Sequence, residues 1–411
     1  MKKHPRFFHR PSLAAPESKI TAAHSVQAAS SVWTLFSLSA SVGVAMIGLG
    51  IIWPIVPVYA VELGASGFQV GMIIASFNVA KVLTNPLCGK LSDKWGRKSF
   101  IVVGLLLYAV NSLLYISATS VTALILVRLF HGLTSVLVIP IAMALTADIA
   151  PDYHLGRFMG TLNMAIMLGM GIGPILGGII RDYFGMEAAF LAMGGLALIT
   201  CIGVVCFIPR RDHPTSLQHA RPVMTITRIF RHRSVQGLFL LRFFTAAGQG
   251  SVYTFLPLLA VQIHLSSSQV GVILSTNIFL IAFLQRVFGT AADHLNPKLM
   301  IIAGTMITGI SVFAMPAAEG FVKILILNVI MGIGNGIAMP AGFVITGKIG
   351  RTMGMGSTMG ITDSGWSLGM IASPVLSGVV MDTLGLPHIF IVGGILITIG
   401  SVLVYFFLKD F

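Results

Sequence analysis

The stretch Gly89-Lys90-Leu91-Ser92-Asp93-Lys94-Trp95-Gly96-Arg97-Lys98 is a short charged segment between two long apolar runs, at about residues 70–91 and 99–118. Its glycines permit a tight turn, and its cations favour the surface of a lipid bilayer over the interior. Each flanking run approaches the roughly 20 apolar residues that a helix needs to cross the hydrocarbon. The stretch therefore predicts a surface loop that joins two membrane-crossing helices.

The composition of the whole chain has the same character. Of its 411 residues, 55% are hydrophobic and 9% are charged, and the mean hydropathy is +0.92. A typical soluble protein has about 25% charged residues, so this chain has too few to cover a soluble fold. The net charge of +13 lies mainly between the apolar runs and does not predict nucleic-acid binding. The three cysteines and scattered histidines predict neither disulfides nor a metal site, and we expect no cofactor.

Twelve apolar runs of suitable length follow one another along the chain. Continuous runs favour helices, which satisfy their own backbone hydrogen bonds in lipid. The sequence therefore predicts an all-α membrane protein with twelve transmembrane helices in two six-helix, pseudo-symmetric bundles. We expect a cytosolic tail at 1–33, an N-terminal bundle at 34–208, a basic linker at 209–234 and a C-terminal bundle at 235–411. The linker's six arginines are expected to anchor it on the cytosolic side; alternatively, the linker binds lipid or has a regulatory role.

The distribution of Lys and Arg predicts the orientation. Twenty of the 26 lie on the side of the two termini, four lie within spans, and Arg181 and Lys323 lie on the opposite side. Positively charged loops tend to stay on the cytosolic side of the membrane. We therefore expect a multi-pass cell-membrane protein with both termini in the cytosol. The absence of Asn-x-Ser/Thr acceptors favours a bacterial inner membrane.

An internal repeat relates the two halves at an offset of 200 residues. Gln69-Val70-Gly71 matches Gln269-Val270-Gly271, and the matched landmarks include the pairs Asp93 and Asp293, Pro174 and Pro374, and Asp182 and Asp382. Six spans per half make this a parallel repeat, a plan associated with secondary transporters that rock one half against the other.

The opening stretch resembles the G-x-L-x-D-R-x-G-R-R/K loop of the major facilitator superfamily, with Lys94 in place of arginine. A degenerate second copy follows the eighth span. The resemblance implies that Asp93 meets the start of span 11 and latches the halves together on the cytosolic side; alternatively, the basic residues only set topology. The predicted gate residues are Gly89, Asp93, Lys94, Gly96, Arg97, Lys98, Gly289 and Asp293.

The fifth span resembles the G-x-x-x-G-P-x-x-G-G element of the superfamily's drug/proton antiporter group. The residues that carry it are Gly169, Gly173, Pro174, Gly177 and Gly178. The pattern favours export; the alternative is ordinary small-residue packing between membrane helices.

Charged residues inside spans are costly and suggest function. Lys81 in span 2 and Asp363 in span 11 replace uncharged repeat equivalents, Ile281 and Asn163. We expect Lys81 and Asp363 to meet near the midplane, with Asp363 as a proton carrier or, alternatively, half of a static ion pair. Arg128 belongs to an element that resembles the superfamily's R-x-x-Q/H-G. As a fixed cation it would tune a nearby acid or attract an anionic substrate; alternatively, it donates hydrogen bonds to backbone carbonyls of neighbouring helices. Arg242 and Arg286 are expected to be structural, with Arg242 reaching the headgroups.

Polar and aromatic residues of the spans are candidates for a central cavity or for hydrogen bonds between helices: Trp53, Asn78, Asn163, Gln249, Tyr253, Asn277 and Asn328. The sequence predicts a proton-coupled transporter, not an enzyme, that exports a small, partly hydrophobic compound by alternating access. Its partners would be that substrate, protons and the bilayer, with no nucleic acid and no required oligomer. The alternatives are a metabolite, siderophore or organic-anion transporter, by uniport or symport, and a non-transporting membrane sensor.

Overall fold

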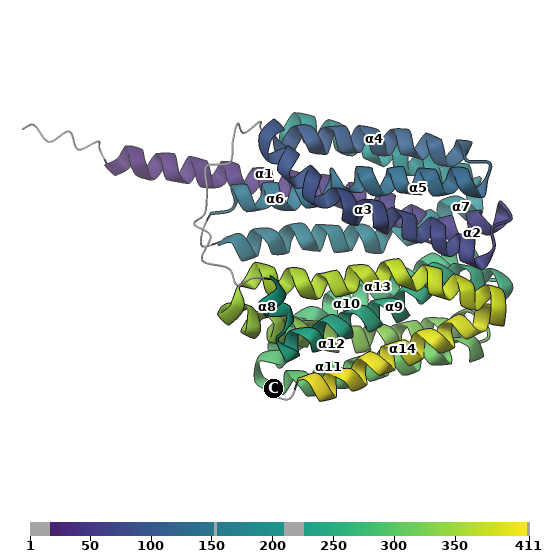
Figure 1. Cartoon of the computed structure of the whole chain (residues 1–411). Coiled ribbons are helices and arrows are strands. Elements are labelled where there is room, and N and C mark those ends of the chain that lie inside the picture. Colours follow the sequence, from purple (N-terminus) through teal and green to yellow (C-terminus); the bar gives the residue numbers. More distant parts are fainter. Residues whose placement is uncertain (1–16, 152–153, 209–225, 409–411) are drawn as a thin grey trace, which may run out of the picture.

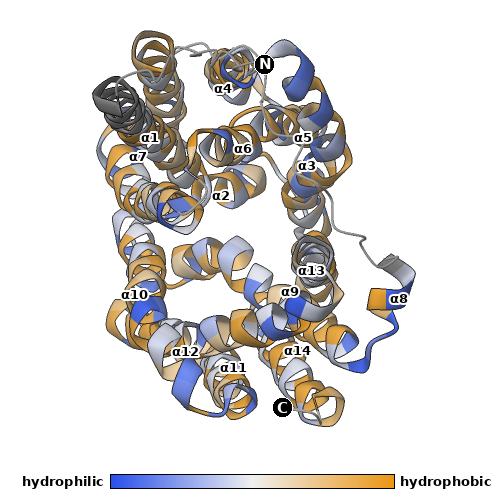
Figure 2. Cartoon of the chain, turned by 90° about the vertical axis from the view of Figure 1, so that its left-hand side faces the viewer, coloured by the Kyte–Doolittle hydropathy of each residue, from blue (hydrophilic) through white to orange (hydrophobic). Residues whose placement is uncertain are grey.

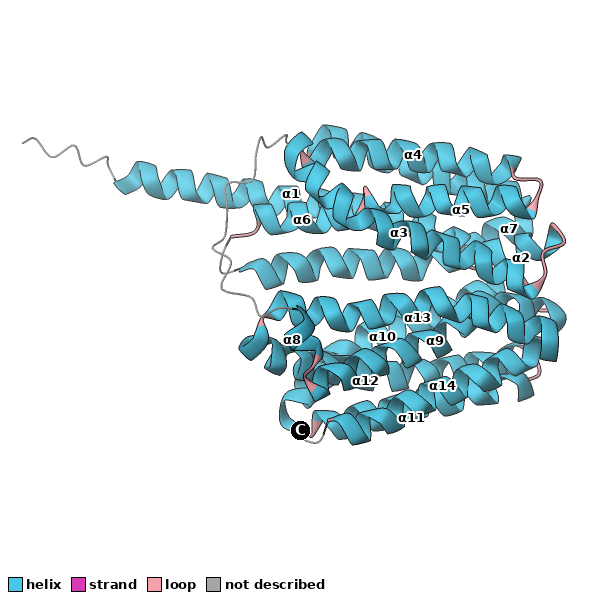
Figure 3. Ribbon diagram, viewed as in Figure 1, coloured by secondary structure: helices cyan, strands magenta, loops and turns pink. Residues whose placement is uncertain are grey.

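The computed structural model describes residues 17–151, 154–208 and 226–408, and its regular elements there are all helical (Figures 1 and 3). The predicted linker, 209–234, falls mainly outside the described residues. Half of the predicted tail does as well, and the first helix begins inside that tail, at Glu17.

The first group of helices ends where α7 ends. Pro54 lies in the break between α1 and α2, and a second break separates α5 from α6 just before Pro140. Gly185, with φ of +85°, interrupts α7 and divides it into two helices. The elements are α1 (Glu17–Ile52), α2 (Ile55–Glu62), α3 (Gly67–Trp95), α4 (Arg97–Ser117), α5 (Val121–Val136), α6 (Ile139–Ile149) and α7 (Leu155–Phe207).

The second group follows the short helix α8 (Ile226–Phe230). It lacks the breaks that divide the first and fourth spans of the first group. Its helices are α9 (Arg233–Gln262), α10 (Ser267–His294), α11 (Pro297–Ala314), α12 (Phe321–Met353), α13 (Met355–Leu384) and α14 (Leu386–Phe407), with a 3₁₀ turn, η2 (Met315–Ala317), after α11.

The helices are long and apolar enough to account for the predicted spans. Ten stretches among the described residues meet the requirements for crossing a membrane. One of them, Leu155–Phe207, consists of two helices joined at Gly185 and therefore counts as two spans. The twelfth span is the 30-residue α9, which packs against α13 and α14. The twelve-helix fold is therefore confirmed. Large apolar side chains such as Leu83, 73% exposed, and Phe283, 69% exposed, remain on the outside, as expected of a surface that faces lipid.

The two groups lie side by side, and two seams carry their main contacts: α3 packs against α13, and α7 packs against α10 (Figure 2). We call the end of the molecule that holds the α3–α4 turn and the end of α14 the terminal end, and the opposite end the far end (Figure 1). Both seams run from one end to the other.

The helices α3 and α10 start at the far end with the same cap. Ser66 accepts a hydrogen bond from the Gln69 N–H at 3.3 Å, and the Gln69 side chain accepts from the Ser66 N–H at 2.9 Å. Ser266 and Gln269 repeat this capping box 200 residues later. The box satisfies the third N–H of each helix and leaves the first two N–H groups free for other partners.

Candidate functional site

At the far end, an aspartate from each group binds the start of a helix in the other group. The carboxylate of Asp382 on α13 accepts from the Gly67 N–H at 2.7 Å and the Phe68 N–H at 2.8 Å. These are the first two N–H groups of α3. Both bonds cross the α3–α13 seam.

The α7–α10 seam repeats the arrangement. Asp182 accepts from the Ser267 N–H at 3.0 Å, the Ser268 N–H at 2.7 Å and the Ser268 hydroxyl at 2.6 Å. In the sequence, Asp182 and Asp382 stand out only as matching landmarks of the repeat. Their equal spacing after the glycine-rich segment in both halves was the signal that could have identified them.

Below these aspartates the backbones of the two groups touch. A Cβ atom on Gly71 would lie 2.2 Å from the carbonyl oxygen of Pro374, and one on Gly271 would lie 2.2 Å from that of Pro174. A cavity of only about 20 Å³ remains beside Gly178 at this end. The far end of both seams is therefore closed.

The glycines of the fifth-span pattern are divided between two neighbours. Cβ atoms on Gly169, Gly173 and Gly177 would meet α1 at 2.3–2.6 Å, whereas one on Gly178 would meet the Ser267 carbonyl oxygen of α10 at 2.3 Å. The pattern thus brings α7 close to its own group and to the other group at once.

The terminal end of the same seams is different. Cβ atoms built on the glycines of the four seam helices near this end would meet no heavy atom within 4 Å: Gly89, Gly156, Gly160, Gly289, Gly356 and Gly360. The close backbone contacts of the far end thus have no counterpart at these six glycines. The described seam is tight at the far end and loose at the terminal end.

The loop after α3 bonds within its own group. The Arg97 guanidinium lies 3.0 Å from Asp93 and also donates to Asp148, and Lys98 donates to the carbonyl of Val205 at 2.9 Å. Gly96, with φ of +89°, makes the turn between α3 and α4. The Asp93 side chain is 52% exposed and pairs with Arg97, so the contact with the start of span 11 is not made in this structure. Asp93 does not reach the start of span 11 because the two groups are not in close contact at the terminal end.

The other loop residues point to solvent in this structure. Lys94 and Asp293 are exposed, and no ion pair of either is found among the described residues. The degenerate second copy therefore lacks even the Asp–Arg pair of the first.

Asp363 pairs with Arg242 rather than with Lys81. Nη2 of Arg242 on α9 lies 2.6 Å from Oδ1 of Asp363, whose side chain is 63% exposed. The guanidinium also lies over the rings of Phe343, at 5.2 Å, and Trp366, at 5.7 Å. Among the described residues Lys81 has no ion-pair partner. The expected Lys81–Asp363 contact is thus absent here, and Arg242 does not merely reach the headgroups.

Packing within the second group explains this choice of partner. Cβ atoms on Gly365 and Gly369 would lie 2.5 Å from the carbonyl oxygens of Phe239 and Phe243 on α9. The small face of α13 therefore draws α9 close and sets Arg242 beside Asp363. That small face, together with a cation inside span 7, was the sequence signal for this pair.

Lys81 nevertheless lies at a height similar to that of Asp363. The helices α3 and α13 are antiparallel, with Gly71 against Pro374. Ten residues further along α3, at Lys81, the same register on α13 reaches residue 364, next to Asp363. The two side chains belong to facing helices, but the carboxylate bonds to its own group.

Arg128 lies inside the first group. It is 5% exposed, and its guanidinium donates to the Tyr115 hydroxyl at 3.3 Å and to the Ile73 carbonyl at 3.4 Å. It also lies 4.7 Å from the centre of the Phe77 ring, and Tyr115 in turn bonds Nδ1 of His131 at 2.9 Å. These contacts fit the alternative in which Arg128 ties three helices together.

The candidate cavity residues separate into two sets. Trp53 and Tyr253, at equivalent positions of the repeat, meet between the groups with ring centres 5.1 Å apart. Asn78 is half-buried and donates to its own helix at 3.5 Å, whereas Asn163 is exposed.

The remaining three are buried inside the second group. Gln249 donates to Asn335 at 2.5 Å, and Asn277 donates to the Asn328 carbonyl at 3.0 Å and accepts from Tyr253 at 3.5 Å. Gln249, Asn277 and Asn328 are 0–3% exposed. Gln249 and Asn277 therefore make hydrogen bonds between helices, as the alternative interpretation expected. Within the described part of the chain, the side-chain amide of Asn328 has no hydrogen-bond partner, and only its backbone carbonyl accepts a bond.

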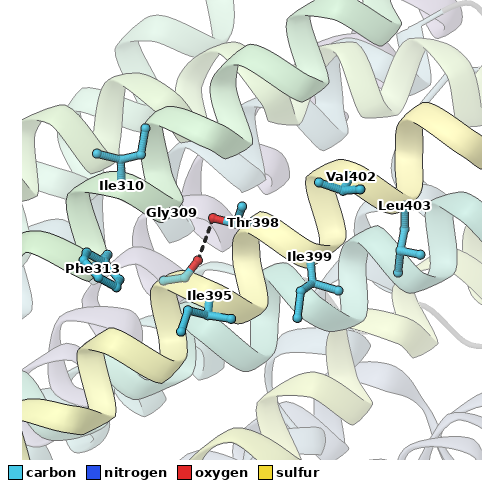
Figure 4. A pocket seen from close by; sticks show the side chains of 9 residues that line it. Gly309, Ile310, Phe313, Ile395, Thr398, Ile399, Val402 and Leu403 are labelled. Atoms are coloured by element: carbon cyan, nitrogen blue, oxygen red, sulfur yellow. Dashed lines mark hydrogen bonds between the residues drawn. The ribbon is translucent and has the colours of Figure 1, made fainter.

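A larger cavity, of about 330 Å³, lies between α11 and α14 on the apolar outer side of the second group (Figure 4). It is lined by residues such as Gly309, Phe313 and Ile395. Its one hydroxyl, on Thr398, donates to the Gly394 carbonyl at 2.9 Å, so this cavity offers a polar solute no free partner.

Two helical groups built on one repeat, tight at one end of their seams and loose at the other, define a two-half polytopic membrane protein. The chain belongs to the Major Facilitator Superfamily, whose model matches residues 38–259 and 238–410. It is therefore a secondary transporter of small molecules and not an enzyme. The predicted family and fold are confirmed.

The chain is similar to several known proteins over most of its length. It is 32% identical to an uncharacterized MFS-type transporter of Methanocaldococcus jannaschii, over 84% of this chain and 90% of the relative. It is 26% identical to Multidrug resistance protein 2 of Bacillus subtilis, over 88% and 92%. A bacterial homologue of the human lysosomal transporter Spinster, solved inward-facing and unoccupied, shares the fold, with a TM-score of 0.79, 14% identity and coverage of 93% and 98%.

Proposed function

We propose that this chain is a proton-coupled transporter that exports a small, partly hydrophobic compound by alternating access. The observation that carries the proposal is the contrast between the two ends of the same seams: bonded and touching at the far end, loose at the terminal end. A site between the groups would then be reached from the terminal end. Export is supported by the similarity to Multidrug resistance protein 2 and by the fifth-span pattern.

We place the terminal end in the cytosol. The sequence predicts twenty of the 26 Lys and Arg residues on the side of the two termini, which is the expected bias for cytosolic loops. Both termini would then be cytosolic, in a bacterial inner membrane. The bundles would comprise residues 34–208 and 235–411, joined by the basic linker 209–234.

Asp363 is the proposed proton carrier. It is the acid that lies well inside a predicted span, where a lone charge costs about 2.5–3.5 kcal/mol. Ionised, it is neutralised by Arg242 at 2.6 Å; protonated, it gives up that ion pair. Its 63% exposure supports proton exchange with water on the terminal side. The alternative remains a static ion pair, and Lys81 is the proposed second partner once the terminal end closes.

A transport assay in inverted membrane vesicles tests export. Ethidium is the probe, and a pH gradient with an acidic vesicle interior drives its uptake into vesicles that contain the protein. We expect uptake with the gradient and little after its collapse by nigericin. Equal uptake in vesicles without the protein would contradict drug export.

A second candidate is transport of a metabolite, siderophore or organic anion. Lys81, a cation of the seam with no ion pair among the described residues, favours it. The same vesicles with a fluorescent carboxylate dye as probe would separate the two: uptake of the anion that is lost in Lys81→Gln supports the second candidate.

A further inference from the structure

The caps of α3 and α10 are incomplete within their own groups. Ser66 and Gln69 satisfy each other and the third N–H of α3, and the first two N–H groups are satisfied by Asp382 of the other group. In α10, Ser266 and Gln269 do the same, and Asp182 completes the cap. An open far end would leave both pairs of N–H groups without these acceptors.

The two bonds are reciprocal. Asp182 reaches from the first group to the second, and Asp382 reaches from the second to the first. Each uses both carboxylate oxygens, and a negative charge at a helix N-terminus is further stabilised by the aligned peptide dipoles. The same chemistry therefore closes both seams.

The backbone beneath each aspartate suits a contact that must open and close. Gly67 meets Gly378, and Gly71 meets Pro374, through backbone atoms. Few side chains interdigitate at these positions, so separation would break the carboxylate bonds without a repacking of side chains. The carboxylates are then the specific attraction across a smooth contact.

We infer that Asp182 and Asp382 are positioning residues that hold the far end shut and thereby set the balance between the two access states. They act as a pair of latches, each made of one carboxylate and the first turn of a helix from the opposite group. The Asp182 latch is the stronger, because the Ser268 hydroxyl adds a third bond at 2.6 Å, where the equivalent Phe68 has no hydroxyl. This inference rests on the alternating access proposed above but not on Asp363.

Cysteine labelling from both sides of the membrane tests the latches. Cys88, Cys201 and Cys206 are first replaced by alanine. Val58→Cys, 5% exposed beside the small far-end cavity, reports opening of the far end, and Thr161→Cys, exposed on α7 near the terminal end, reports the opposite side. The reagent is a membrane-impermeant maleimide, applied to intact cells for Val58→Cys and to inverted vesicles for Thr161→Cys.

Asp182→Ala and Asp382→Ala are each expected to raise labelling of Val58→Cys about tenfold, equal to a shift of ~1.4 kcal/mol, and to lower labelling of Thr161→Cys. The shift should be larger for Asp182→Ala, larger still for the double variant, and smaller for the corresponding asparagine variants, which keep one acceptor oxygen. Ser268→Ala, which leaves both backbone bonds intact, should give a small shift in the same direction.

Ser66→Ala and Ser266→Ala are the matched controls, because their bonds lie within one group. They should lower the melting temperature without favouring either side. Unchanged labelling in both aspartate variants, or an equal rise at both reporters, would overturn the inference. The assay needs neither substrate nor a pH gradient, so its failure would leave the result of the ethidium uptake assay standing, and failure of ethidium uptake would leave the labelling result standing.

Discussion

The carboxylate of Asp363 lies 2.6 Å from the guanidinium of Arg242, and both residues belong to the second helical group. The pair therefore forms without a contact between the two groups. A proton on Asp363 would release Arg242 inside its own group, between Phe343 and Trp366. Coupling to the other group would then pass through the face of α13 that packs against α3.

Replacing Arg242 separates charge pairing from packing. Arg242→Ala should abolish proton-driven ethidium uptake, whereas Arg242→Lys should keep part of it because the charge remains. The melting temperature of Arg242→Ala should fall below that of Arg242→Lys, because the alanine variant leaves Asp363 as an unpaired charge inside a span, at a cost of about 2.5–3.5 kcal/mol. Full transport by Arg242→Ala, measured in inverted vesicles, would show that the pair has no part in coupling.

Lys81→Gln tests the partner that the sequence suggested. Because Asp363 already pairs with Arg242, this variant should retain ethidium uptake and its coupling to protons. Its maximal rate should fall a few-fold if Lys81 meets Asp363 when the terminal end closes. Complete loss of coupling with normal folding would make Lys81, and not Arg242, the essential partner.

Gly271→Ala should disturb the far-end seam, because its Cβ would lie 2.2 Å from the Pro174 carbonyl oxygen. Overpacking of this kind costs about 1–3 kcal/mol, so the melting temperature in detergent should fall. Gly160→Ala, whose Cβ meets nothing within 4 Å, is the control and should melt at or above the parent temperature. Equal melting of the two variants would argue against the closed seam.

Tyr115→Phe should destabilise the first group and leave coupling intact. Its hydroxyl joins Arg128 and His131, and loss of a buried hydrogen-bonded group costs about 1–3 kcal/mol. Tyr405→Phe, at a side chain 61% exposed, should melt normally. A variant Tyr115→Phe that melts normally but transports without a pH gradient would return Arg128 to the coupling machinery.

Patterns repeated along the chain predicted the fold. Long apolar runs, the offset of 200 residues and the loop from Gly89 to Lys98 gave the helices, their order and the family, because each feature is local or periodic. The breaks that divide the first and fourth spans, beside Pro54 and Pro140, were not predicted.

The partners of charged side chains could not be predicted in the same way. Lys81 and Asp363 lie at a similar height on facing helices, but Arg242 is brought nearer by the small face of Gly365 and Gly369. Asp93 likewise binds Arg97 while the terminal end is loose. A transporter has more than one arrangement of its halves, and each arrangement selects its own contacts.

Proton movement driven by substrate in Asp363→Asn tests directly whether Asp363 carries the proton. Ethidium is added to inverted vesicles that hold a preformed pH gradient, and a fluorescent pH dye follows proton release. The parent and the control Glu319→Gln, at a side chain 92% exposed, should release protons upon addition of ethidium, whereas Asp363→Asn should bind ethidium but release none. Proton release at the parent rate by Asp363→Asn would contradict the proposed carrier.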